Sequence, residues 1–248
     1  MKLLPTVVFL FFFSLVSASS ISFSSMKEQA LNADSSAILR IDSLEYEGTY
    51  PLYKLDYLRA CAYLSQSMFT KSLEHIKLAL GSDEISSDTV VHKQAYMLLS
   101  ELAVFSCSLL DASRFIVDGK RYAEDINDRL LEASILLSEG VIYRRIGFLN
   151  KAHNSLFGGI RILEKGDDLN SIYYLSHAYG LLMISYMHES DFKAAWHVGH
   201  KRKLVLDLLK DKDKRGYLYD NQAGYYYSKM AYLHYLMGDK DKARECCD

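Results

Sequence analysis

One stretch in the middle of the chain decides the fold: residues 136–156 read LLSEGVIYRRIGFLNKAHNSL. Its apolar residues recur at three- and four-residue intervals, which is the spacing of one face of an α-helix. Gly140 is followed three residues later by Tyr143, a glycine stands at position 147, and a small residue returns at Ala152. Small residues let two helices approach closely while a ring fills the space beside them. The stretch therefore predicts two helices packed against each other around a tight turn at Gly147.

The same unit recurs along the chain. Two clear copies lie at residues 179–195 and 227–247, and two weaker copies centre on residues 60–76 and 96–116. No run of apolar–polar alternation is long enough to predict a strand. Because self-similarity at a period of a few tens of residues is typical of stacked helical units, we expect a repeat fold.

These units resemble the tetratricopeptide repeat (TPR) family, whose pattern is Trp-x2-Leu-Gly-x2-Tyr on a first helix and Ala-x3-Phe on a second. Tyr143 and Ala152 are nine residues apart, as are Tyr186 and Ala195, and the family pattern has the same spacing. The family's closing proline is missing, and the units are spaced by 40 to 48 residues instead of about 34. The resemblance implies an all-α, right-handed α-solenoid of about five TPR-like repeats with longer helices than usual.

The first residues have the order of a secretory signal peptide. Lys2 precedes an apolar run over residues 3–16, and Val16-Ser17-Ala18 supplies the small residues of a cleavage site. The apolar run is shorter than the roughly 20 residues that span a bilayer, which favours cleavage after Ala18 over an uncleaved anchor. We therefore expect residues 1–18 to be a signal peptide and the protein to be exported, as a periplasmic or envelope-associated protein of a bacterium.

The rest of the chain divides into two parts. Residues 19–51 are expected to form a short N-terminal cap of two helices, at 24–31 and 35–46, and residues 52–248 the TPR-like repeat domain. Pro51 is permitted at the start of the first full helix. Asp248 falls inside the expected second helix of the last unit, so we expect the domain to be truncated at its C-terminus and to continue in a longer protein.

Some single residues carry local predictions. Asp88, Asn127 and Asn170 stand where their side chains would cap the start of a helix. The pair Gly158-Gly159 lies in a helical stretch and is interpreted as a point where two helices pack closely. Tyr227 stands where the repeat pattern has tryptophan, so we expect it in the core.

Composition and motifs narrow the classes of function. Half of the 248 residues are hydrophobic and the formal net charge is −2, which predicts a packed core and argues against a generally basic nucleic-acid-binding surface. The basic runs at 201–203 and 210–215 are interpreted as solvated helix ends. The hydrolase nucleophile elbow, the P-loop, the dinucleotide-binding glycines and the zinc motif His-Glu-x-x-His are all absent. We therefore predict no catalytic residues, no enzyme activity and no cofactor.

Histidines and cysteines leave one alternative open. His197 and His200 share a helix face, so a third ligand from a neighbouring helix would complete a zinc site. No cysteine or carboxylate stands at a fixed ligand spacing beside them, which favours ordinary surface or groove histidines. The cysteines are interpreted as small buried apolar residues and not as disulfide partners; they are Cys61, Cys107, Cys246 and Cys247.

The resemblance also implies a binding groove. In TPR-like pairs the first helix lines the concave side, and the second, fifth, ninth, twelfth and thirteenth positions of the repeat face the groove. With Gly140, Met183 and Ala231 at the eighth position, the predicted groove residues are Gln94, Glu101, Arg144, Arg145, His177, His188, Tyr225, Ser228, Tyr232 and Tyr235. Two adjacent arginines suit a carboxylate, and tyrosines suit the apolar or aromatic parts of the same ligand. The alternative for the arginines is weak pairing with surface acids.

The sequence thus favours a non-catalytic scaffold that binds a protein or peptide in its groove outside the cytoplasm. It looks like the exported TPR sensor portion of bacterial membrane-bound regulators, which implies signal transduction and membrane association through a C-terminal part beyond residue 248. One alternative is a periplasmic metal-binding protein or enzyme that uses the region from His177 to His200. Another is a structural subunit of an envelope assembly.

Overall fold

The computed structural model describes residues 22–32, 34, 36–106 and 109–247, and every regular element within them is helical. The elements are α1 (Phe23–Leu31), α2 (Ala37–Tyr46), α3 (Leu52–Ser65), α4 (Phe69–Leu80), the 3₁₀ helix η1 (Asp83–Ser87), α5 (Thr89–Ser106), α6 (Leu109–Asp125), α7 (Arg129–Arg145), α8 (Leu149–Leu163), α9 (Leu169–His188), α10 (Phe192–Lys212), α11 (Tyr217–Leu236) and α12 (Lys240–Glu245). The expected all-α repeat fold is confirmed, with five helical pairs after the pair α1–α2. The signal peptide predicted for residues 1–18 lies outside the described residues.

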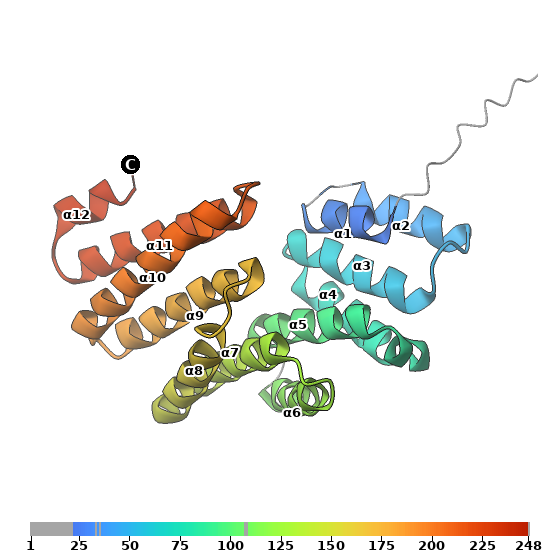
Figure 1. Cartoon of the computed structure of the whole chain (residues 1–248), viewed down its shortest axis with the longest axis horizontal. Coiled ribbons are helices and arrows are strands. Elements are labelled where there is room, and N and C mark those ends of the chain that lie inside the picture. Colours follow the sequence, from blue (N-terminus) through green and yellow to red (C-terminus); the bar gives the residue numbers. More distant parts are fainter. Residues whose placement is uncertain (1–21, 33, 35, 107–108, 248) are drawn as a thin grey trace, which may run out of the picture.

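The pairs stack into an open arc (Figure 1). α5 to α8 form its middle, and the arm of α9 to α12 faces the arm of α1 to α4. A contact joins the arms near their inner ends, where Arg215 Nη1 lies 3.5 Å from Glu28 Oε1. Both side chains are largely exposed, so this pair contributes little to stability. The arc nevertheless brings residues that are far apart in the sequence to one inner side.

The turn between the two helices of a pair is a Schellman motif in four pairs. Between α7 and α8, the Phe148 amide donates to the Tyr143 carbonyl at 2.9 Å, and Gly147 takes the left-handed conformation with a φ of 81°. The tight turn predicted at Gly147 is therefore confirmed. The equivalent left-handed residues in the other three turns are Ser67, Ser190 and Gly238, with φ values of 59°, 61° and 83°.

One of the three predicted helix caps is correct. The Asp88 carboxylate accepts the Val91 amide at 3.1 Å. The prediction for Asn127 is wrong, because Asn127 is itself a left-handed residue (φ 51°) and Asp128 caps α7 instead. The prediction for Asn170 is also wrong: Asp168 caps α9 and accepts the Asn170 amide. A run of polar residues before a helix shows that a cap is near but does not identify which residue turns inward.

Glycines let helices touch at two of the three predicted points. Gly140 and Ala152 are buried between α7 and α8, as predicted. A Cβ built on Gly159 would lie 2.9 Å from Leu137 Cδ2, so this residue is a close-packing point. The prediction for Gly158 is wrong, because its Cβ would make an ordinary contact at 3.4 Å with Leu136.

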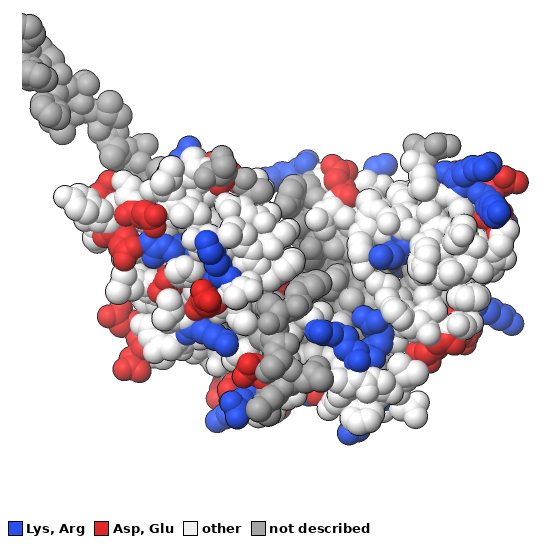
Figure 2. All heavy atoms as spheres, turned by 180° about the vertical axis from the view of Figure 1, so that it is seen from behind, with Lys and Arg blue, Asp and Glu red and all other residues white. Residues whose placement is uncertain are grey.

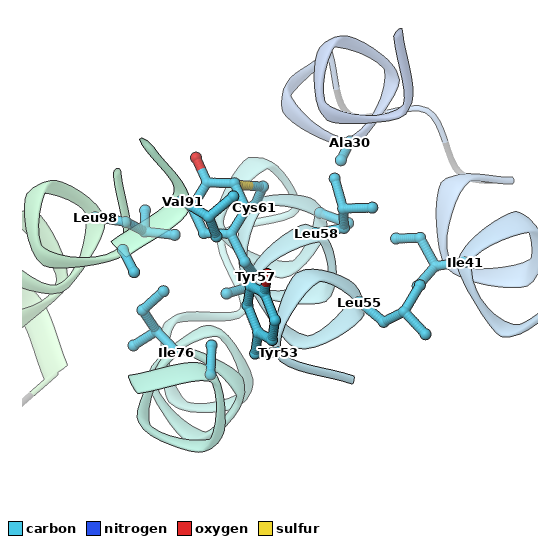
Figure 3. Close-up of a cluster of buried hydrophobic side chains, with 14 of the residues drawn as sticks. Ala30, Ile41, Tyr53, Leu55, Tyr57, Leu58, Cys61, Ile76, Val91 and Leu98 are labelled. Atoms are coloured by element: carbon cyan, nitrogen blue, oxygen red, sulfur yellow. The ribbon is translucent and has the colours of Figure 1, made fainter. Parts of the chain in front are cut away.

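The α1–α2 pair covers the first full repeat. Leu55 and Leu58 of α3 point toward Ile41 of α2 and Ala30 of α1, and all four are fully buried (Figure 3). Burial of a leucine contributes about 1.5–3 kcal/mol, so this contact stabilises the cap against the first full repeat. The N-terminal helical cap expected from the sequence is present.

The far end of the arc differs from expectation. Tyr227 is 39% exposed, whereas its neighbour Tyr226 is buried. Tyr227 borders a hollow together with Ser228 and Cys246, so the prediction of a core position for it is wrong.

The rear face of the arc carries mixed charge (Figure 2). Figure 2 shows basic and acidic side chains interspersed on the rear face and separated by uncharged surface. Of the helices that the structure describes, none has both the length and the apolar character of a membrane span.

Candidate binding groove

The inner side of the arc contains a cavity of about 540 Å³. Its wall comes from the first helices of four successive pairs, α5, α7, α9 and α11. α7 contributes Ser134, Leu137, Val141 and Arg144, which are spaced by three or four residues and therefore share one helix face. The cavity lies in the size range of ordinary ligand sites.

A second cavity of about 800 Å³ continues from the first. It is lined by residues of α1, α3, α5, α7, α9 and α11, and it shares Glu101, Tyr173 and Tyr174 with the first cavity. Tyr174 Oη donates to Glu101 Oε1 at 3.5 Å, so these two residues form the wall where the cavities meet. We refer to both cavities together as the inner groove.

The structure brings five of the ten predicted groove residues to the inner groove. Glu101, Arg144, His177 and Tyr225 line the first cavity, and Gln94 and Glu101 line the second. Arg144 stands at the twelfth position of its repeat, and His177 and Tyr225 stand at the second position of theirs. Gln94 and Glu101 lie on the corresponding face of α5.

The other five predicted residues lie elsewhere. Arg145 is exposed and donates to the carbonyl of Val104, while His188 is exposed at the end of α9. Ser228 lines a separate hollow with Tyr227 and Cys246, and Tyr232 and Tyr235 are exposed on α11. The physical reason is that the thirteenth position turns away from the inner side, and only the first half of α11 reaches the groove.

Sequence reasoning missed Arg202. It belongs to the basic run 201–203 that was interpreted as a solvated helix end, and this interpretation is wrong because Arg202 is fully buried. Opposite it lies Gly180, on which a Cβ would stand 2.9 Å from Arg202 Nη1, so only a glycine leaves room for the guanidinium. The signal was available in the spacing: Val198, Arg202 and Leu206 follow one another at four-residue intervals on the buried face of α10.

Burial sets the protonation states in the groove. Crowding by the surrounding protein raises the pKa of Glu101 to about 7, although its side chain remains in reach of groove solvent. Burial and the charge of Arg202 lower the pKa of His177 to about 4. Burial also lowers the pKa of Arg202 to about 10. At neutral pH the groove therefore holds cationic arginines, a neutral imidazole and a carboxyl group near its midpoint of titration.

The histidines of the fourth repeat do not converge. His177 lines the inner groove, His197 lines a hollow between α8 and α10, and the His200 ring packs on Trp196 with centroids 3.9 Å apart. Within the described ranges, no group of three or more His, Cys, Asp or Glu residues lies close enough together to hold a metal ion.

The cysteines differ in their surroundings. Cys61 is buried, as interpreted, and burial raises the pKa of its thiol to about 11. Cys246 is half-buried and Cys247 is exposed, so the interpretation as buried residues is wrong for Cys247. Cys107 lies outside the described residues.

The chain is similar in structure to a solved protein. A crystal structure of the apo form of RapI superposes on this chain with a TM-score of 0.61, covering 90% of this chain and 93% of that chain at 14% sequence identity. The two chains share a fold. A likeness at this level of identity shows the fold alone. No protein-family model and no curated protein matches the sequence.

Proposed function

We propose that this chain is a non-catalytic scaffold that binds an extended peptide or protein segment along the inner groove. The observation that carries the proposal is the continuity of the groove. First helices from every part of the arc line it, and its two cavities meet at Glu101 and Tyr174. An elongated groove of this kind fits an extended chain better than a compact ligand.

Polar groups in the groove support the same proposal. Gln94 lines the second cavity, and its buried Oε1 has no hydrogen-bond donor among the described residues. A buried acceptor without a donor costs about 1–3 kcal/mol. Arg144 lines the first cavity with no ion-pair partner in the described part of the chain. The groove thus has a side-chain amide in the wall of the second cavity and a cationic hydrogen-bond donor in the wall of the first.

Selection from a random peptide library tests the proposal. Val104→Trp places a large ring in the first cavity, and Val117→Trp places the same ring on the exposed face of α6. Peptides selected on the wild-type chain are expected to lose at least about tenfold in affinity on Val104→Trp and to bind Val117→Trp normally. Equal binding to both variants would place the peptide site outside the groove.

We also propose that the scaffold acts outside the cytoplasm as the sensor portion of a membrane-bound regulator. The support is the charge, apolar run and small residues of positions 2–18, together with the resemblance to exported TPR portions. N-terminal sequencing of the protein recovered from an exporting host should begin at Ser19. Recovery of intact Met1 would contradict export by cleavage.

A further inference from the structure

Arg202 is a buried charge without an acidic partner. It lies on α10 with no exposed surface, and its Nη2 donates to Gln222 Oε1 at 2.9 Å and to the Gln222 carbonyl at 3.3 Å. Its Nη1 has no hydrogen-bond partner among the described residues. No carboxylate of the described residues forms an ion pair with it, and the groups that act on its charge are the two tyrosines at 225 and 226. Burial of a guanidinium in this way leaves its field uncompensated by the chain.

The field of Arg202 reaches the first cavity of the inner groove. Three residues cover the guanidinium on that side: Gln222 accepts its hydrogen bonds, the Tyr225 ring centroid lies 5.1 Å from its Cζ, and the imidazole of His177 feels its charge. All three residues line the cavity. These three residues form the floor of the cavity above Arg202. Because little water separates Arg202 from this floor, its charge is screened less there than it would be at an open surface.

Arg144 adds a second cation on the wall of the same cavity. Its side chain is half-buried, and the charged or polar groups that act on it are Tyr225 and the like-charged Arg145. Tyr225 is therefore influenced by both Arg144 and Arg202. In the second cavity, by contrast, Lys93 pairs with Asp128 at 2.5 Å, and Lys27 Nζ lies 5.9 Å from the Tyr57 ring centroid. Lys229 Nζ also lies 5.2 Å from the Tyr225 ring centroid, so positive charge gathers around Tyr225 at one end of the first cavity.

The remaining wall of the cavity has an aliphatic part and a polar part, the latter formed by Glu101, Tyr173, Tyr174, Asn221 and three serines. Val104, Leu137, Val141, Leu181 and Ile184 form the aliphatic part beside the cationic end. A ligand that satisfies the aliphatic part and the cationic end has an apolar body and one negatively charged group. The guanidinium of Arg144 presents two parallel N–H groups, which match the two oxygens of a carboxylate.

We propose that the first cavity binds a carboxylate carried on an apolar body, with Arg144 contacting the carboxylate and Arg202 acting through the floor as a fixed positive charge. This proposal deepens the proposed function and rests on it, since the last residue of a peptide with a free C-terminus is one such ligand. A free organic acid has the same chemistry. Neutral His177 and the Tyr225 hydroxyl supply further hydrogen-bond donors at the same end.

Calorimetry on the full chain with matched probes tests the proposal. The probes are N-acetyl-phenylalanine and its C-terminal amide, and a pentapeptide of four alanines and one C-terminal phenylalanine as free acid and as amide. Each acid is expected to bind at least about tenfold more tightly than its amide. If only the pentapeptide acid binds, the source is a peptide terminus; if both acids bind alike, a free acid suffices. Equal affinity for acid and amide, or no binding of any probe up to about 10 mM, would overturn the proposal.

Two adjacent arginines provide a matched control. Arg144→Met removes the cation on the cavity wall, and Arg145→Met removes its exposed neighbour, which does not line the cavity. The preference for acid over amide should disappear in Arg144→Met and persist in Arg145→Met. A preference that survives Arg144→Met would assign the carboxylate to another site.

Arg202 is proposed to act through the floor of the cavity, so its test must distinguish the effect of its charge from an effect on the shape of the cavity. Arg202→Met should reduce the acid preference while the affinity for the amide probe stays the same, and Arg202→Lys should restore part of the preference. Equal loss of acid and amide binding in Arg202→Met would show that Arg202 only supports the cavity wall. If selected peptides bind the groove but acids and amides bind equally, the proposed function stands and this inference fails.

Discussion

Gly140 and Leu156 lie so close across the α7–α8 contact that a Cβ on Gly140 would stand 2.7 Å from Leu156 Cγ. It would also lie 3.1 Å from the Ala152 carbonyl, which is backbone and cannot move aside by itself. Gly140→Ala should therefore destabilise the chain by about 1–3 kcal/mol through overpacking, and Gly140→Leu by more. Thermal melting measures the loss.

Gly158→Ala is the matched control for this change. Gly158 lies in α8 of the same pair, and its added Cβ would meet only Leu136 at 3.4 Å. Because alanine favours a helix interior over glycine by about 1 kcal/mol, Gly158→Ala should leave the melting temperature unchanged or raise it. An equal loss in both variants would mean that close packing is not what constrains Gly140.

The left-handed turn residues predict changes of opposite sign. Gly147→Ala has room for its methyl group but forces an L-residue to a φ of 81°, which costs about 1 kcal/mol. Ser190 already sits at a φ of 61°, so Ser190→Gly relieves this strain and should leave stability unchanged or raise it. Chemical denaturation of both variants measures the change in the free energy of unfolding. A loss of stability in Ser190→Gly as large as that in Gly147→Ala would contradict the prediction.

Glu101 predicts a pH dependence of stability. Burial raises its pKa to about 7 in the folded chain, above the unfolded value near 4.5, so its contribution to stability is fully present below about pH 4.5 and is lost as the pH rises through 7. The groups that face the carboxyl are the hydroxyls of Tyr57 and Tyr174 and the thiol of Cys61, with Lys27 beyond the thiol. Access to groove solvent makes the effect smaller than it would be in a sealed core.

Glu101→Gln tests this dependence. The variant should gain melting temperature relative to wild type at pH 8 and show little gain at pH 5. Glu124→Gln, on the exposed face of α6, should change neither value. A gain that is equal at both pH values would show that the carboxyl does not titrate between them.

His177 predicts a loss of stability in acid. Burial and the charge of Arg202 lower its folded pKa to about 4 from 6.5, so its contribution is present above about pH 6.5 and is lost as the pH falls through 4. His177→Gln should reduce the fall in melting temperature between pH 7 and pH 4.5. His188→Gln, at an exposed position, should leave that fall unchanged. NMR titration of the His177 ring measures the pKa directly, and a value near 6.5 would contradict the prediction.

The sequence by itself determined the repeat, because the features that specify it are local. The three- and four-residue spacing of apolar side chains, the small residues at Gly140 and Ala152 and the turn at Gly147 act within one helical hairpin. Each was correct in the structure. Local errors were small, as with Asn127 and Asn170, where the cap lies one or two residues away.

Only the tertiary structure decided the groove. The repeat alignment predicted that both Arg144 and Arg145 face the groove. In the structure the stacking of the helical pairs brings Arg144 to the cavity and leaves Arg145 outside it. Glu101 and Tyr174 are separated by 73 residues and meet because the arc bends α5 toward α9. Arg202 is buried because Gly180 lies opposite it on another helix. The curvature of the arc results from the packing contacts between all successive pairs, so no single stretch of sequence specifies it. This curvature determines which charged residues meet in the groove.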